Sequence, residues 1–173
     1  MKARLLLLCL WIPVYAIAAV PQGYQRIGEA YGIPPKLLYA VALTESEAPG
    51  IGKPWPWTAN VAGEGHYFAS RQALFDALNE LQKRGETHFD VGPAQINWYW
   101  NSGLFDSLWE ATDPYVNLQT AASLLRGYYR ETGSFEVAVG KYHAPNNQQR
   151  AKRYRSRVWQ RLALVSRAGG DKR

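Results

Sequence analysis

Apolar side chains recur every three to four residues along most of the chain after residue 20, which predicts a mainly helical domain. Tyr24, Ile27 and Tyr31 follow this spacing up to Gly32. A second helix is predicted to begin at Pro34-Pro35, because proline fits the first helical turn. The apolar stripe of this second helix consists of Leu37, Leu38, Val41 and Ala42.

Four more helices are predicted after residue 70. Ser70 and Asp113 are placed as N-caps, and Gly133-Ser134 separates the helix that follows Asp113 from a short helix ending at Tyr142. The last helix comes after the polar loop 145–147 and carries arginine and lysine opposite its apolar stripe. We interpret that basic side as solvated, with an electrostatic role in binding an anionic polymer as the alternative.

Residues 55–70 depart from helical spacing. Two β-prone runs, 57–61 and 66–69, flank the glycine-containing stretch 62–65, and this pattern predicts a β-hairpin. Residues 90–93 are assigned to a loop. The predicted fold class is therefore mainly α, with a small β-hairpin insertion.

The N-terminal segment has the anatomy of a secretory signal peptide. Lys2 and Arg4 precede an apolar run over residues 5–20, and small residues up to Ala18 suit cleavage there. The alternative is an uncleaved membrane anchor. The run is shorter than the roughly 20 residues that a spanning helix needs, and Pro13 interrupts it, so we favour the signal peptide.

These boundaries predict a signal peptide (1–18), one domain (19–168) and a disordered tail (169–173). The single cysteine, Cys9, lies inside the leader, so a disulfide framework and a cysteine nucleophile are excluded for the processed chain. Processing also predicts export without stable membrane insertion.

The formal net charge of +6 falls to +4 when Lys2 and Arg4 are removed, because 18 basic and 14 acidic residues remain. A modest positive charge suits an anionic partner such as a cell wall or nucleic acid. A nucleic-acid-binding module conflicts with the signal peptide and lacks a docking motif. The three histidines show no metal-ligand spacing and no glycine-rich phosphate loop occurs, so we expect neither metal nor cofactor.

Glu45 is the candidate acid that the pattern singles out. At about 100° per residue it falls near the direction of Leu38 and Val41, at the edge of the apolar stripe. Burial there would raise its pKa, and a carboxyl group that stays protonated near neutral pH can protonate a leaving oxygen. The alternative is a frayed helix end with Glu45 and Glu47 both in water. Glu47 points elsewhere on the helix.

Three segments, in order along the chain, resemble the motifs of the soluble lytic transglycosylase family. Residues 33–38 (IPPKLL) followed by 42–46 (ALTES) resemble its helix that ends in Glu-Ser. Residues 90–97 (DVGPAQIN) resemble its glycine-plus-glutamine motif, in a form similar to the branch associated with conjugation, secretion and pilus systems. Residues 138–144 (AVGKYHA) resemble the third motif, usually Ala-x-x-x-Tyr-Asn-x-Gly, and Tyr154 matches a tyrosine that often follows.

The resemblance implies a lysozyme-like helical domain that acts on the glycan strands of peptidoglycan. It implies that Glu45 is the catalytic acid/base, that Gln95 lines the cleft and that Tyr142 lies near the acid. Three more positions of these motifs are expected to contact substrate: Ser46, Asn97 and His143. Pro93-Ala94 stands where the family often has leucine and usually has methionine, His143 where it usually has asparagine, and Pro145 where glycine is common. These departures put sugar contacts in doubt more than the acid.

About forty residues separate Glu45 from the second motif, and this insertion carries the predicted hairpin. Our hypothesis is that Trp57 and Tyr67 form one wall of a glycan groove. The alternative is a packing flap whose aromatic side chains are buried in a small core of their own.

The reaction that the resemblance implies is cleavage of the bond between N-acetylmuramic acid and N-acetylglucosamine with formation of a 1,6-anhydro ring, in the periplasm, for a possible conjugation or secretion apparatus. It needs one carboxyl group and no cofactor. One alternative is a hydrolytic muramidase, with Asp90 or Glu64 as a second carboxylate. Another is a non-catalytic peptidoglycan-binding subunit of a secretion machine.

Overall fold

A computed structural model describes residues 20–168, so the predicted signal peptide (1–18) and tail (169–173) lie outside the described residues. The described part contains eight α-helices, one 3-10 turn and one four-stranded antiparallel sheet, which confirms the predicted fold class. The helices are α1 (Gln22–Tyr31), α2 (Pro35–Ser46), α3 (Arg71–Lys83), α4 (Trp98–Asn101), α5 (Leu108–Ala111), α6 (Pro114–Thr132), α7 (Phe135–His143) and α8 (Gln148–Ala168), with the 3-10 turn η1 at Ser102–Leu104. The strands are β1 (Thr58–Val61), β2 (Glu64–Tyr67), β3 (Phe89–Val91) and β4 (Ile96–Asn97).

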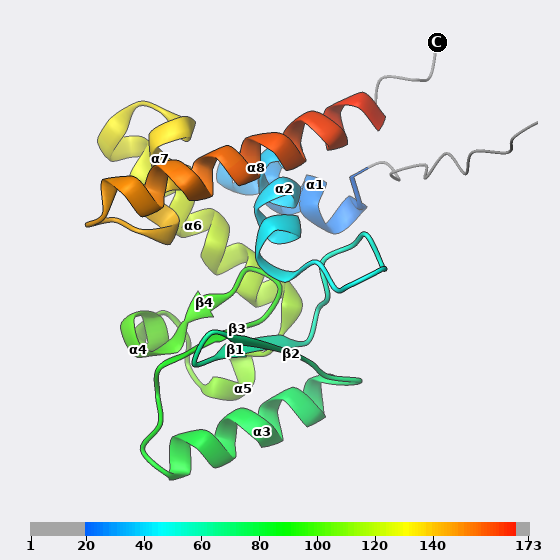
Figure 1. The fold of residues 1–173 in the computed structure, drawn as a ribbon, viewed down its shortest axis with the longest axis vertical. Coiled ribbons are helices and arrows are strands. Elements are labelled where there is room, and N and C mark those ends of the chain that lie inside the picture. Colours follow the sequence, from blue (N-terminus) through cyan, green and yellow to red (C-terminus); the bar gives the residue numbers. More distant parts are fainter. Residues whose placement is uncertain (1–19, 169–173) are drawn as a thin grey trace, which may run out of the picture.

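The sheet and four of the helices, α1, α2, α7 and α8, occupy different ends of the molecule (Figure 1). Figure 1 shows the sheet and α3 in the lower half, with α1, α2, α7 and α8 in the upper half and α6 running between them. Helix α2 packs against α1 and α8, and α7 packs against α6 and α8. Residues 37–43 of α2 are all buried, so this helix is enclosed by its neighbours rather than amphipathic as predicted.

The predicted helix starts are confirmed by their capping bonds. The Ser70 hydroxyl accepts a 3.2 Å hydrogen bond from the Ala73 amide at the start of α3. The Asp113 carboxylate accepts bonds of 2.9 and 3.2 Å from the Tyr115 and Val116 amides at the start of α6. These bonds satisfy amides that have no partner inside the helix.

The predicted hairpin is part of a larger sheet, of order β2-β1-β3-β4. Strands β1 and β2 pair with Val61 opposite Glu64, so the turn consists of Ala62 and Gly63 alone and is shorter than predicted. The assignment of residues 90–93 to a loop is wrong at its first two positions. Residues 90 and 91 belong to β3, whose neighbours β1 and β4 supply the pairing that three residues cannot specify by themselves.

Helix α8 is the longest helix of the described part and lies across α2. Its apolar stripe is buried at Tyr154, Val158 and Val165, as predicted. Over residues 20–168, none of the helices has both the length and the apolarity that a bilayer crossing requires.

Candidate active site

Glu45 lies in the last turn of α2 and its side chain is partly buried. Burial raises the pKa of its carboxyl group from 4.5 to about 7. A hydrogen-bonding interaction with Tyr154 opposes this rise, the negative charge of Asp90 adds to it, and the positive charge of Arg157 opposes it. A carboxyl group with a pKa in this range can both donate and accept a proton near neutral pH.

Tyr154 brings a hydroxyl group from α8 to Glu45. The hydroxyl is buried and makes no hydrogen bond of good geometry, yet it stands close enough to Glu45 to lower the pKa of that carboxyl group. Burial first, and then the charge of Glu45, raise the pKa of Tyr154 well above its ordinary value. Tyr154 therefore keeps its proton and is a potential donor to ionised Glu45.

Tyr142 joins the end of α7 to the segment between β3 and β4. Its hydroxyl donates a 2.6 Å hydrogen bond to the carbonyl oxygen of Ala94. Its pKa is raised well above the ordinary value by burial, and further by the charges of Glu45 and Asp90. The structure thus places residues from all three motif segments within electrostatic reach of one carboxyl group.

Ser46, predicted to contact substrate, has its hydroxyl buried inside the protein. The oxygen lies 2.9 Å from the Ala42 carbonyl oxygen and 2.7 Å from that of Pro93, so its one proton is donated to either of them. The second contact crosses from α2 to the β3–β4 turn. This geometry gives Ser46 a positioning role beside Glu45.

The turn between β3 and β4 has an unusual backbone. Gly92 and Gln95 both have positive φ, of 79° and 48°. The side-chain Nε2 of Gln95 donates a 2.8 Å hydrogen bond to the Gly92 carbonyl oxygen, so the side chain closes the turn. It stays partly exposed. Its predicted place in a cleft remains a prediction.

Asn117, on α6, is a residue that the sequence analysis missed. Its amide nitrogen donates to the carbonyl oxygens of Val91 and Ala111, at 2.9 and 3.2 Å, and its oxygen accepts from the Ala94 amide at 3.0 Å. The side chain is fully buried, and its bonds to Val91 and Ala94 fix the β3–β4 turn against α6. Its signal in the sequence is a polar residue at a position on the buried face of a helix.

Asn97 and Asp90 form a polar pair on β4 and β3. The Asn97 amide nitrogen donates a 2.8 Å bond to the Asp90 carboxylate, and the Asn97 oxygen accepts from the Trp100 amide at 3.2 Å as the N-cap of α4. Burial raises the pKa of Asp90, while the bond from Asn97 lowers it. Both side-chain ends of Asn97 are therefore engaged within the protein.

His143 stacks on the ring of Tyr154, with centroids 4.4 Å apart and planes 5° apart. One side of the imidazole reaches solvent. Lost hydration on the stacked side lowers its pKa, and the charges of Arg157 and Arg150 lower it further. The neutral imidazole of His143 thus covers the ring of Tyr154, the side chain that borders Glu45.

The two aromatic residues of the insertion have different surroundings. Trp57 is partly buried and packs against the main core, not against a small core of the insertion's own, so its place in a groove wall remains a prediction. Tyr67 is 45% exposed, and its hydroxyl donates a 3.3 Å bond to the Glu47 carbonyl oxygen. Tyr67 therefore lies near the end of α2 and remains the candidate for a sugar contact.

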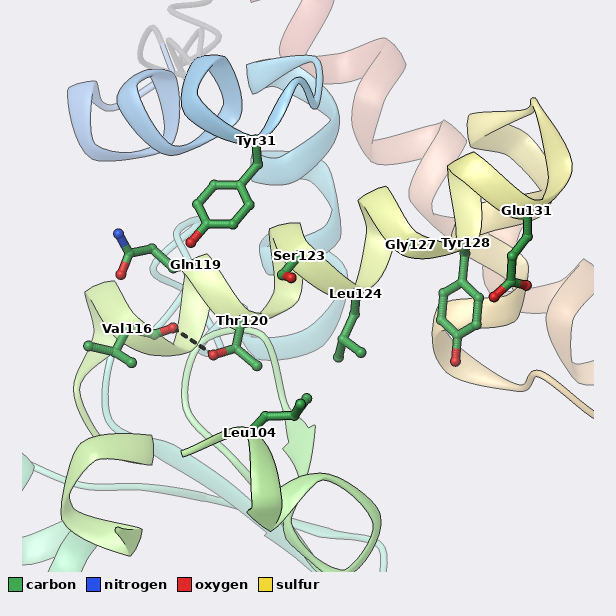
Figure 2. A pocket seen from close by; sticks show the side chains of 10 residues that line it. All are labelled: Tyr31, Leu104, Val116, Gln119, Thr120, Ser123, Leu124, Gly127, Tyr128 and Glu131. Atoms are coloured by element: carbon green, nitrogen blue, oxygen red, sulfur yellow. Dashed lines mark hydrogen bonds between the residues drawn. The ribbon is translucent and has the colours of Figure 1, made fainter. Parts of the chain in front are cut away.

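Two surface hollows have volumes of about 460 and 450 Å³. Figure 2 shows the first, which runs along α6 between Tyr31 of α1 and Leu104 of η1. It contains none of the predicted site residues. The second is lined by His143 and Tyr154, so this one borders the Glu45 cluster.

Within residues 20–168, no three His, Cys, Asp or Glu side chains gather closely enough to hold a metal ion. Comparison with family models, with curated proteins and with solved structures gave no match for the chain. The family resemblance of the three motifs therefore stays a prediction, and the function has to be inferred from the site itself.

Proposed function

We propose that this protein is a peptidoglycan lytic transglycosylase in which Glu45 is the single catalytic acid and base. The observation that carries the proposal is the Glu45 carboxyl group, whose pKa is raised to about 7 and which lies near the buried Tyr154 and the partly buried Tyr142. A group that must first give and then take a proton works best with a pKa near the working pH.

In the first step, protonated Glu45 donates its proton to the oxygen that joins N-acetylmuramic acid to N-acetylglucosamine. The bond from the muramic C1 to that oxygen breaks, and the N-acetylglucosamine side leaves as an alcohol. The carbonyl oxygen of the muramic N-acetyl group attacks C1 and holds the developing positive charge, which replaces a second carboxylate. Tyr154 is positioned to stabilise the Glu45 anion that results.

In the second step, ionised Glu45 takes the proton of the muramic 6-hydroxyl. The freed oxygen bonds to C1 and displaces the N-acetyl oxygen, so that a 1,6-anhydro ring closes and no water is consumed. Glu45 is protonated again and ready for the next cleavage. The motif resemblance supports this route, and with it a periplasmic location and service to a conjugation or secretion apparatus.

Asp90 supports a second candidate function, a hydrolytic muramidase. Its charge reaches Glu45 and contributes to the raised pKa there. A second carboxylate near the acid could activate a water molecule. Against this, Asp90 already accepts a bond from Asn97. Glu64, the other residue considered for this role, is an exposed residue of β2.

The deciding experiment is incubation of the protein and of Glu45→Gln with purified peptidoglycan, followed by mass spectrometry of the soluble products. Anhydromuropeptides from the wild type that disappear with the variant support the proposal. Reducing-end products would move the assignment to the muramidase. A folded protein that binds the wall but yields no products would favour the non-catalytic subunit.

Glu47→Gln is the matched control. Glu47 lies two residues further along the chain and makes an ion pair with Arg161, so the change removes a carboxylate of the same region. A partly exposed pair of this kind contributes little stability. The proposal expects Glu47→Gln to keep the product pattern of the wild type.

A further inference from the structure

The hollow next to Tyr154 is lined almost entirely by side chains of α8. Its volume is about 450 Å³, and it lies where the end of α7 meets the first turns of α8. The lining residues are His143, Arg150, Arg153, Tyr154, Ser156 and Arg157. Three arginines therefore line one small hollow.

The arrangement of the three arginines along α8 lowers the stability of the helix. Arg150, Arg153 and Arg157 are spaced three and four residues apart, so they lie on one face of α8 and repel one another. The first turn of α8 contains no acidic residue. Arg150 and Arg153 lie near the positive end of the helix dipole, which adds to the repulsion.

Other arginines of the same helix do have acidic partners. Arg155 pairs with Glu136 at 3.2 Å, and Arg161 pairs with Glu47. Among the ion pairs formed within residues 20–168, none includes Arg150, Arg153 or Arg157. The charges of Arg150 and Arg157 both act on the His143 ring, which places them around the same point.

This cationic hollow is separated from the candidate acid by one side chain. Tyr154 lines the hollow, and its hydroxyl interacts with Glu45. Arg157 lines it as well, and its charge also acts on Glu45. An anion bound in the hollow would thus lie beside a substrate whose scissile bond is at Glu45.

We propose that the hollow binds a carboxylate of the peptide that the muramic acid residue carries next to the cleaved bond. This inference rests on the proposed function, because that function places muramic acid at Glu45. Guanidinium groups bind carboxylates through paired hydrogen bonds, and the three arginines that line this hollow form no ion pair within the described residues. The bound carboxylate would also relieve the repulsion along α8.

The test uses binding rather than cleavage, so that it can fail independently of the proposed function. The full chain is titrated with a soluble muramyl tripeptide, with the same peptide amidated at its carboxylates, and with inorganic phosphate. Binding is followed by the NMR signals of the His143 imidazole. We expect the free tripeptide to shift these signals at a concentration at least about tenfold lower than the amidated form.

The variant Arg150→Gln/Arg153→Gln should weaken tripeptide binding at least about tenfold and raise the Tm, because repulsion is removed. Arg157 is kept because its charge acts on Glu45. Lys152→Gln, an exposed cation of the same helix that does not line the hollow, is the matched control and should bind as the wild type does.

Three outcomes would overturn the inference. They are equal binding of the free and amidated peptides, phosphate binding as tight as that of the tripeptide, and equal losses in the double variant and in Lys152→Gln. Tripeptide binding by a protein that releases no anhydromuropeptides would remove the proposed catalysis and keep the anion site.

Discussion

The Ser46 hydroxyl oxygen lies 2.7 Å from the Pro93 carbonyl oxygen, and this contact ties the end of α2 to the β3–β4 turn. Both groups are buried. Glu45 precedes Ser46 on the same turn of helix. A change in the position of Ser46 should therefore also change the position of the candidate acid. The serine of the Glu-Ser pair therefore has a structural explanation that does not require substrate.

Removal of this contact should affect both stability and the site. Ser46→Ala leaves the Pro93 carbonyl oxygen without a partner, and we expect a loss of about 1–3 kcal/mol in the free energy of unfolding. Urea denaturation measures it. Thr44→Ala is the control, because the Thr44 hydroxyl bonds only to the Ala40 carbonyl oxygen of its own helix. Equal losses in the two variants would show that the contact between α2 and the turn contributes nothing.

Gly92 should tolerate no side chain. A Cβ atom there would lie 2.5 Å from the Asn117 side chain, and the φ of 79° is strained for other residues. We expect Gly92→Ala to cost about 3 kcal/mol in unfolding free energy, from strained backbone and steric overlap together.

Gly85→Ala separates the two causes. Gly85 has a φ of 80°, but a Cβ atom there would meet no atom within 4 Å. This variant should lose only about 1–2 kcal/mol, the cost of the backbone alone. If both variants lose the same unfolding free energy, the Asn117 side chain can move away at no cost, and its close packing against Gly92 does not contribute to stability.

The titration of Glu45 should be visible in the stability of the protein. Because its pKa rises from 4.5 to about 7 on folding, the native state binds an extra proton between these values, and stability falls as the pH increases through that range. Glu45→Gln lacks this loss. From pH 4 to pH 8, the unfolding free energy of the variant should therefore rise by up to about 3 kcal/mol relative to that of the wild type. A stability difference that stays constant with pH would contradict the raised pKa.

Tyr67 tests the proposed groove wall. Tyr67 is 45% exposed and its hydroxyl bond, at 3.3 Å, is long, so Tyr67→Ala should leave the Tm nearly unchanged. If the ring contacts sugar, binding to peptidoglycan in a sedimentation assay should weaken about tenfold, in the range of a lost aromatic contact. Trp57→Ala is the comparison, because Trp57 packs on the core and its loss should lower the Tm. Unchanged sedimentation of Tyr67→Ala would remove the wall hypothesis.

Local signals allowed most helices to be predicted from the sequence. Caps such as Ser70 and Asp113 act through atoms two or three residues away, and the helix ends they predict are observed. The strand β3 was missed because three residues carry no periodicity, and its pairing with β1 brings together residues about thirty positions apart.

The candidate site also has one part that local signals predict and another that depends on contacts between distant segments. Glu45 could be placed at the edge of an apolar helix, but its pKa depends on tertiary packing: burial raises it most, Asp90 of β3 raises it further, and Tyr154 of α8 lowers it. Asn117 gave no motif signal, since its three bonds reach backbone groups on two other segments. Contacts of this kind are set by tertiary packing and cannot be inferred from spacing along one element.

Tyr142 and Tyr154 should differ in their effect on stability when each loses its hydroxyl. Tyr142→Phe removes the 2.6 Å bond to the Ala94 carbonyl oxygen, which should cost about 1 kcal/mol of stability. Tyr154→Phe removes a buried hydroxyl without a well-formed bond, so stability at pH 4 should be unchanged or slightly higher. The same change should raise the pKa of Glu45, because the interaction with Tyr154 favours the ionised carboxylate.

The Tyr154 effect can be measured as the pH dependence of unfolding in Tyr154→Phe, in parallel with the wild type. The pH range over which stability is lost should extend upward in the variant, since Glu45 holds its proton longer. If the protein is a transglycosylase, the alkaline limb of kcat/KM should move upward with it. A downward shift would mean that Tyr154 donates to the protonated rather than the ionised form of Glu45, and its role in stabilising the Glu45 anion after the first step would have to be withdrawn.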